Sequence, residues 1–229
     1  MRSRALLATT MLLLVACAST PRSDAAPAPE SRFSDEERQK ILAGSADQPM
    51  ALVTNDSFEG DQFLRQKARI IDPLDPDLPH LLSRMRATVE QEKGVGIAAP
   101  QVGISRRIVW VQRLDREPGK PFESYLNPRI GAMSDDTVVD WEGCLSVPAG
   151  FGQVRRPAAI ELTSATSDSA TWETVTGFTA RIFQHEIDHL DGTLFIDRKE
   201  SGELMLEKEY REMRAREKAA SQPACTPAS

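Results

Sequence analysis

The clearest pattern of apolar and polar positions lies between residues 178 and 192. Apolar residues recur there every three to four positions along two sides: Phe178, Ile182, Phe183, Ile187 and Leu190. Gly192 follows this run, and glycine readily adopts the left-handed conformation that ends many helices. The pattern predicts a deeply buried helix that ends near Gly192.

Two more long helices are predicted, one on each side of the chain's centre. The first begins near Asp77 and Pro79, ends before Gly94, and has an apolar row at helical spacing: Leu78, Leu81, Leu82, Met85 and Val89. The second is a charged helix from Asp197 to Ala220. We expect it to pack back on the core through one side: Leu206, Tyr210 and Met213.

Runs rich in β-branched residues predict strands at Arg107 to Leu114, Thr137 to Trp141 and Ala159 to Thr163. They are separated by Pro, Gly, Asp and Ser and precede the buried helix. Strands followed by one buried helix indicate an α+β domain rather than a parallel α/β layout.

The first residues have the layout of a signal peptide. Arg2 and Arg4 precede an apolar run, Ala5 to Ala16, that is too short to span a bilayer. The run closes with Leu14-Val15-Ala16-Cys17, which resembles the lipobox of bacterial lipoproteins. That resemblance implies cleavage before Cys17, lipidation of Cys17 and attachment to a membrane. An uncleaved anchor and a plain secretory signal are the alternatives, and both also export the protein.

The residue after the cysteine is Ala18 rather than aspartate, which favours an outer membrane facing the periplasm as the destination. An Ala-, Pro- and Ser-rich tether follows. Ser34 to Glu37 then resembles a capping box that opens a short helix ending near Gly44. The last residues, 221–229, are expected to form a flexible tail.

Composition describes a globular protein. The 229 residues are 40% hydrophobic and 27% charged, with a formal net charge of −6. Removal of residues 1–16 takes away two arginines and lowers the net charge to −8. An acidic balance argues against a nucleic-acid surface, so no nucleic-acid partner is expected.

The buried helix also carries the most informative polar residues. His185 and His189 are four positions apart, so both imidazoles leave the same face and can bind one metal ion. Glu186 is next to the first histidine, where it can take a proton from a water molecule that the metal activates. A buried histidine pair without a metal is the alternative. It is disfavoured because polar groups in an apolar helix need partners.

Catalytic metals usually have three protein ligands and an open position. No histidine follows His189, so the third ligand is either a carboxylate or Cys144. Cys144 follows a predicted strand, and Gly143 before it allows a tight turn. A third stretch, Gly94 to Gln101, combines small residues with the amide of Gln101, but alone it indicates no particular ligand.

Together these stretches resemble the peptide deformylase family. Its Gly-x-Gly-x-Ala-Ala-x-Gln loop, Glu-Gly-Cys-Leu-Ser segment and His-Glu-x-x-His helix all occur here in order, at 94–101, 142–146 and 185–189. The resemblance covers roughly residues 60 to 200. It implies an α+β fold with antiparallel strands around the metal-binding helix, and a C-terminal helix. The chain then divides into a signal peptide (1–16), a tether with a short helix (17–48), a deformylase-like catalytic domain (49–220) and the tail.

The resemblance implies hydrolysis of the N-formyl group from formyl-methionyl peptides, with release of formate. Carried over by position, Cys144, His185 and His189 bind one divalent metal ion, with Fe²⁺ favoured and Zn²⁺ or another ion as alternatives. Glu186 is then the general acid and base, and the oxyanion is held by Gln101 and the Leu145 backbone. The implied substrate-binding residues are Gly96, Ile97, Ala98 and Glu142. Of these, Glu142 is expected to orient its loop and the others to pair with the peptide backbone. We expect a monomer.

The predicted export signal would distinguish this chain from deformylases that act on nascent chains in the cytosol. Oxidising compartments favour disulfides, so a bridge between Cys144 and Cys225 is an alternative to metal binding by Cys144. An exported zinc protease is the second alternative, with Glu203, Glu207 or Glu209 as third ligand. A lipoprotein that binds metal or peptide without turnover is the third, although metal binding alone requires neither Glu186 nor Gln101.

Overall fold

A computed structural model of the chain describes residues 29–165 and 172–220. Its helices are η1 (Pro29–Ser31), α1 (Asp35–Leu42), α2 (Phe58–Leu64), α3 (Leu78–Gln91), η2 (Ala99–Val102), α4 (Gly177–Leu190), α5 (Phe195–Arg198) and α6 (Glu207–Ala220). Its strands are β1 (Gly96–Ala98), β2 (Ile108–Gln112), β3 (Phe122–Leu126), β4 (Arg129–Met133), β5 (Thr137–Cys144), β6 (Val147–Pro157), β7 (Ala159–Thr163) and β8 (Glu173–Thr176).

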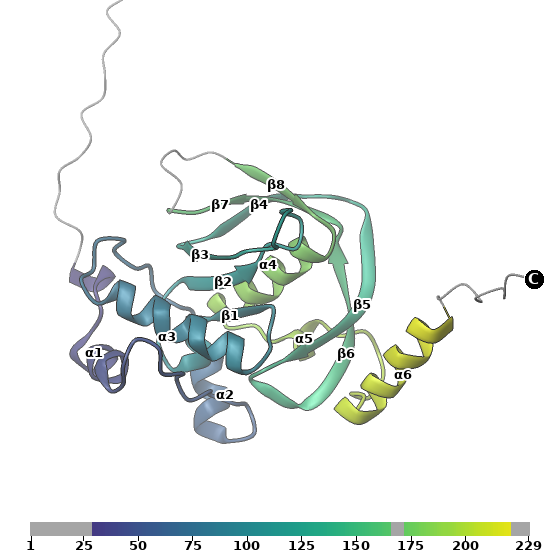
Figure 1. Ribbon diagram of the computed structural model, residues 1–229, viewed down its shortest axis with the longest axis horizontal. Helices are drawn as coiled ribbons and strands as arrows, with labels where there is room; N and C mark the ends of the chain where they lie inside the picture. The colour runs from purple at the N-terminus through teal and green to yellow at the C-terminus, as the bar shows by residue number, and fades with distance from the viewer. Residues whose placement is uncertain (1–28, 166–171, 221–229) are drawn as a thin grey trace, which may run out of the picture.

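Antiparallel sheets surround α4 (Figure 1). The described strands pair in the orders β1-β2-β3, β4-β7-β8 and β5-β6. The predicted α+β class with a central helix and a C-terminal helix is therefore confirmed. Figure 1 shows α1 to α3 on one side of the sheets and α6 on the other, beside β5 and β6.

The core lies on both sides of the β1-β2-β3 sheet. One cluster joins α1 and α3 to the sheet through residues that include Ile41, Leu81 and Ile108. The other joins α4 to the strands through residues that include Phe183 and Val109. Helix α4 is therefore fixed by packing along most of its length, which holds its polar residues in place.

Most of the predicted helices and strands are present. Helix α3 begins and ends close to its predicted limits, β7 spans Ala159–Thr163 as predicted, and Gly192 has a positive φ of 74° after α4. The prediction that both apolar sides of α4 are buried is wrong for Phe178, which is 48% exposed. Phe178 lies in the first turn of α4, where it lines a cavity instead of packing in the core.

The single helix predicted from Asp197 to Ala220 is also wrong. Helix α5 ends at Arg198, and the chain then runs extended along β6 before α6 begins at Glu207. Isolated bridges from Lys199 to Val154 and from Met205 to Phe151 hold this extended segment. Backbone pairing with β6 thus replaces the helix that local propensity favours. Leu206, expected to face the core, is 60% exposed, whereas Tyr210 and Met213 are half-buried.

The segment before residue 49 packs on the domain. Ser34 accepts a hydrogen bond from the Glu37 N–H, and the Glu37 side chain accepts one from the Ser34 N–H, so the predicted capping box is confirmed. The buried guanidinium of Arg106 donates to Glu37 and to the carbonyl oxygens of Glu30 and Arg32. These contacts attach α1 to the sheet, because Arg106 directly precedes the residues that enter β2.

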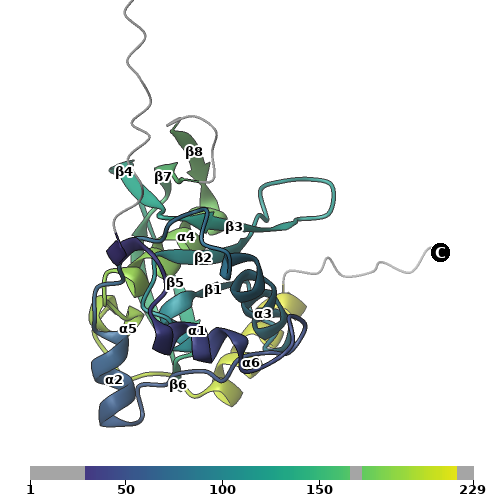
Figure 2. The ribbon, with the colours of Figure 1, turned by 90° about the vertical axis from the view of Figure 1, so that its left-hand side faces the viewer.

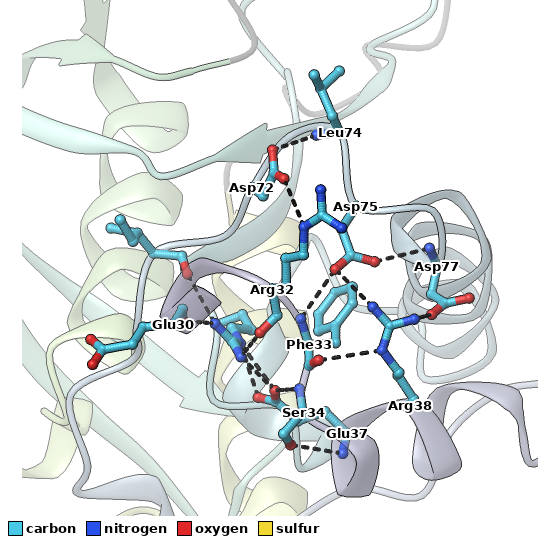
Figure 3. A network of polar contacts seen from close by, with 12 residues as sticks. Glu30, Arg32, Phe33, Ser34, Glu37, Arg38, Asp72, Leu74, Asp75 and Asp77 are labelled. Atoms are coloured by element: carbon cyan, nitrogen blue, oxygen red, sulfur yellow. Dashed lines mark hydrogen bonds and ion pairs between the residues drawn. The ribbon is translucent and has the colours of Figure 1, made fainter. Parts of the chain in front are cut away.

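Figure 3 shows how the same segment meets the loop before α3. The N–H of Phe33 donates to Asp75, and Arg38 forms ion pairs with Asp75 and Asp77. In Figure 2, α1 and α3 face the viewer together in front of the sheets. Across the ranges 29–165 and 172–220, none of the helices has the length and apolar character needed to traverse a lipid bilayer.

Candidate metal centre

Three side chains that are predicted metal ligands meet at one point. His185 and His189 leave the same face of α4, and Cys144 reaches them from the end of β5. Their ligand atoms all lie within 4.8 Å of one another, and Cys144 Sγ is 3.2 Å from His189 Nε2. Tetrahedral coordination with bonds of 2.0–2.3 Å places ligand atoms about 3.5 Å apart, so this group fits a first-row divalent metal ion.

A tight hairpin brings Cys144 to this position. Strands β5 and β6 are joined through Leu145 and Ser146, with Cys144 paired to Val147 and a register shift just before it. The Ser146 N–H donates to Cys144 Sγ at 3.3 Å. Gly143 leaves room for the Phe151 ring, since a Cβ at Gly143 would lie 2.4 Å from Phe151 Cε1. The hydrogen bond from Ser146 and the close packing at Gly143 thus hold the Cys144 side chain in its orientation.

Glu142 lies behind the metal ligands. Its Oε2 accepts a hydrogen bond from His185 Nδ1 at 3.0 Å, so His185 Nε2 remains for a metal. Burial alone would raise the pKa of the Glu142 carboxyl, but hydrogen bonds from Arg156 and His185 hold that pKa well below its usual range. Arg181 adds a third ion pair at 2.6 Å. The Glu142 carboxylate is therefore ionised, and both of its oxygens accept hydrogen bonds.

Glu186 faces the pocket from the same helix. Its side chain is buried, and among the described residues its Oε2 has no hydrogen-bond partner. A Cβ at Gly96 would lie 2.5 Å from Glu186 Oε1, so β1 passes close to the carboxylate. Burial raises the pKa of Glu186 to about 7. A group with that pKa can accept and release a proton near neutral pH.

The side-chain amide of Gln101 lies beside the Cys144 sulfur. The Ala98 N–H donates to Gln101 Oε1 at 2.8 Å, which turns Gln101 Nε2 toward Cys144 Sγ at 3.5 Å. Gln101 is buried in η2 directly after β1. Gly96, Ile97 and Ala98 form β1, which is one of the two edge strands of its sheet. The structure thus brings Gly96 and Gln101 to the same cavity as Cys144, whereas Ile97 and Ala98 are buried and are not among the residues that line it.

One cavity of about 740 Å³ connects these groups. Its lining includes Gly96, Gln101, Cys144, His185 and Glu186. This volume is typical of a ligand pocket and is larger than a single side chain requires. The site can therefore bind a ligand that extends beyond its metal-binding end.

Several residues of the site were not predicted from sequence. Arg156 and Arg181 neutralise Glu142, and Phe151 and Tyr210 line the cavity. Only Arg181 offered a signal, because a charged residue inside an apolar helix requires a buried partner. The other three come from β6 and α6, and their positions depend on how the chain folds back.

The structure bears on the alternative metal ligands, but not on the predictions for the other two cysteines. Within the part of the chain that the structure describes, the candidate metal-binding group contains Cys144, His185 and His189 and none of the glutamates proposed for a protease. Cys17 and Cys225 lie outside the described residues. Lipidation of Cys17 and the Cys144–Cys225 bridge therefore stay predictions.

The family described as polypeptide deformylase matches residues 58–204. The chain is 43% identical over 162 residues to peptide deformylase 2 of Nostoc sp., covering 67% of this chain and 90% of that protein. It is similar to the crystal structure of peptide deformylase from Thermotoga maritima, with 35% identity, a TM-score of 0.60, and coverage of 67% of this chain and 99% of that one. It is also similar to the Met-Ala-Ser-bound class I type b peptide deformylase from Acinetobacter baumannii, with 32% identity, a TM-score of 0.58, and coverage of 66% and 99%.

Proposed function

The chain belongs to the polypeptide deformylase family, and from this premise we propose that it hydrolyses the N-formyl group of formyl-methionyl peptides, releasing formate. One observation carries the proposal. Cys144, His185 and His189 lie together beside the carboxylate of Glu186 and the amide of Gln101, and all of these residues except His189 line one cavity. A formamide resists attack at neutral pH, so its hydrolysis needs an activated water and donors for the developing negative charge.

A divalent metal ion belongs to this chemistry, and Cys144, His185 and His189 would hold it. When bound, it supplies Lewis acidity and makes water acidic enough to ionise near neutral pH. A thiolate with two imidazoles suits Fe²⁺ and Zn²⁺ better than Mg²⁺ or Ca²⁺. We favour Fe²⁺. Metal analysis after anaerobic purification tests this choice, and stoichiometric zinc without iron would contradict it.

Glu186 would move the proton. As the water adds to the formyl carbon, Glu186 accepts a proton from it and later passes that proton to the departing amine nitrogen. The C–N bond breaks, and formate and a free amino terminus result. The pKa of about 7 and the unpartnered Oε2 among the described residues support this role.

Gln101 and Leu145 would hold the oxyanion. The Gln101 Nε2 lies 3.5 Å from Cys144 Sγ, and Leu145 directly follows Cys144 at the tip of the hairpin. A side-chain amide and a backbone N–H beside Cys144 are donors of the kind that stabilise developing negative charge.

The peptide would extend along β1. Gly96, Ile97 and Ala98 lie at the edge of their sheet, and an edge strand can pair with an extended peptide. Glu142 would act behind the site, through His185, rather than contact the peptide.

Formate release from formyl-Met-Ala-Ser tests the activity. Wild-type protein is expected to release formate, and Glu186→Ala is expected to lose at least about a hundredfold in kcat while keeping its metal. Metal-loaded wild-type protein that releases no formate would contradict the proposal.

We further propose that the protein is a monomer that is exported and anchored to a membrane through Cys17. There it would remove formyl groups from peptides outside the cytoplasm. The lipobox-like residues Leu14 to Cys17 support this. Wild-type protein is expected in the membrane fraction with Cys17 acylated, and Cys17→Ser in the soluble periplasm. Recovery in the cytosol with an unmodified Cys17 would disprove it.

A further inference from the structure

Two buried arginines hold the segment that precedes the family match, which begins at residue 58. The guanidinium of Arg106 donates to the carbonyl oxygens of Glu30 and Arg32. The guanidinium of Arg84 donates to four more carbonyl oxygens of this segment, those of Lys40, Ile41, Gln48 and Pro49. Both arginines are at most 5% exposed, so their charges depend on these partners. The start of the described chain, at Pro29, is therefore fixed on the domain.

This start lies beside the loop before α3. The Asp72 N–H donates to the Ser31 carbonyl oxygen at 2.8 Å, and Arg106 donates to the carbonyl oxygens of both Glu30 and Ile70. Cys17 lies twelve residues before Pro29, and that length of chain spans at most about 40 Å. This limit is comparable to the diameter of a domain of this size. An anchor at Cys17 would therefore hold this part of the domain closest to the membrane.

Leu74 projects from the loop before α3. Its exposed fraction is 83%, the highest among the large hydrophobic residues that the structure describes, and Ile70 is 52% exposed. The Leu74 N–H donates to Asp72 Oδ1, and the Asp77 N–H donates to Asp75 Oδ1, each at 3.0 Å. Figure 3 shows the Leu74 side chain pointing away from this cluster of carboxylates. The loop thus turns its carboxylates inward and holds a leucine in solvent.

The exposed charges nearby do not repel phosphate groups. Arg32 and Arg69 are 50% and 52% exposed, whereas their carboxylate partners, Asp72 and Glu37, are at most 8% exposed. Each pair thus presents its guanidinium to solvent, and guanidinium groups bind phosphate well. We define the tether face as the exposed residues Glu30, Arg32, Arg69, Ile70 and Leu74. It has no excess of negative charge, although the whole chain is acidic.

We propose that the tether face lies on the membrane surface, with Leu74 inserted between the lipid headgroups and the acyl chains. This inference rests on the proposed lipid anchor at Cys17. An apolar side chain beside guanidinium groups suits a phospholipid surface that the anchor already holds within reach. A second copy of the chain suits the face less. Stable protein interfaces bury more than about 1,000 Å², and two apolar side chains offer far less.

Hydroxyl-radical labelling, read by mass spectrometry, measures the exposure of these side chains without any substitution at the tether face. The comparison is between acylated wild-type protein on phosphatidylethanolamine and phosphatidylglycerol vesicles and Cys17→Ser protein in solution. Labelling of Leu74 is expected to be about threefold lower on the vesicles. Leu206 is 60% exposed and directly precedes α6, on the other side of the sheets in Figure 1, so its labelling should not change.

Two results would overturn the inference. One is equal labelling of Leu74 on vesicles and in solution. The other is protection of Leu74 in soluble Cys17→Ser protein that grows with protein concentration, because it would identify a second copy of the chain as the partner. An unmodified Cys17 would instead refute the proposed anchor, and the inference with it.

Leu74→Asp tests the apolar contact in the acylated protein. A carboxylate is costly to bury in an apolar environment, so labelling of Ile70 on vesicles is expected to rise about twofold over wild type. Leu206→Asp makes the same change at another exposed leucine and should leave the labelling of Ile70 unchanged. Both variants should release formate at the wild-type rate, which verifies folding. Equal labelling of Ile70 in Leu74→Asp and wild type would contradict the insertion of Leu74.

Discussion

Glu142 Oε2 lies 3.0 Å from Nδ1 of His185, across 43 residues of sequence. This single contact fixes which nitrogen of His185 can bind a metal. It also joins the β5–β6 hairpin, which supplies Cys144, to α4, which supplies both imidazoles. The metal site is therefore assembled by a buried ionic contact between two distant elements as well as by the ligands themselves.

Loss of this contact should weaken metal binding. Glu142→Gln removes the negative charge that orients and polarises His185, and such changes typically cost about 10–100-fold in metal affinity. Competition with a chromogenic chelator measures the affinity. Glu59→Gln, an exposed change in α2, is the control. Equal affinity of the Glu142 variant and wild type would show that the contact has no such role.

Gly96→Ala should impair catalysis more than metal binding. The new Cβ would lie 2.5 Å from Glu186 Oε1, so either β1 or the carboxylate must move. Small displacements of a catalytic group can cost about a hundredfold in rate. Steady-state formate release and metal content, measured on the same preparation, separate the two effects. An unimpaired kcat in Gly96→Ala would contradict the close approach.

The buried pair of Arg106 and Glu37 should contribute strongly to stability. Arg106→Ala leaves a buried carboxylate without its main partner, a change that costs about 3–5 kcal/mol in comparable cases. The free energy of unfolding from urea titrations measures this cost. Arg69→Ala removes a second, 52% exposed partner of Glu37 and should cost less than about 1 kcal/mol. Similar losses of unfolding free energy in both variants would show that the burial of Arg106 does not increase its contribution to stability.

The ion pair of Asp115 with Arg113 should make stability fall in acid. Hydrogen bonds from Arg113 lower the pKa of Asp115 to about 2, against an ordinary value of 3.8. Between these values the unfolded chain binds more protons than the folded one, so acid favours unfolding. The contribution, about 1–2 kcal/mol for this 28% exposed side chain, is present above pH 4 and is lost as the pH falls through 2.

Asp115→Asn tests this pH dependence. The difference in unfolding free energy between wild type and variant should be largest above pH 4 and shrink toward pH 2, as measured by urea titrations at each pH. Asp135→Asn, at an exposed position, controls for the loss of one negative charge. A difference that does not change with pH would mean that Asp115 does not titrate as its contact with Arg113 requires.

Local patterns in the sequence determined much of this protein. The course of α4, the shared face of His185 and His189, the capping box at Ser34 and the strand from Ala159 to Thr163 all follow from periodicity or spacing within one element. Such features depend on neighbours a few residues away, and the chain carries that information directly. The three motifs of the resemblance likewise indicated the metal ligands by position.

The tertiary structure alone decided how distant elements meet. It brought Cys144 to within 3.2 Å of His189, neutralised Glu142 with Arg156 and Arg181, and exposed Phe178 at the start of α4. It also divided the predicted C-terminal helix, because backbone pairing with β6 is worth more there than helical propensity. These outcomes depend on the register of strands and on packing between segments far apart in the chain, which no local period encodes.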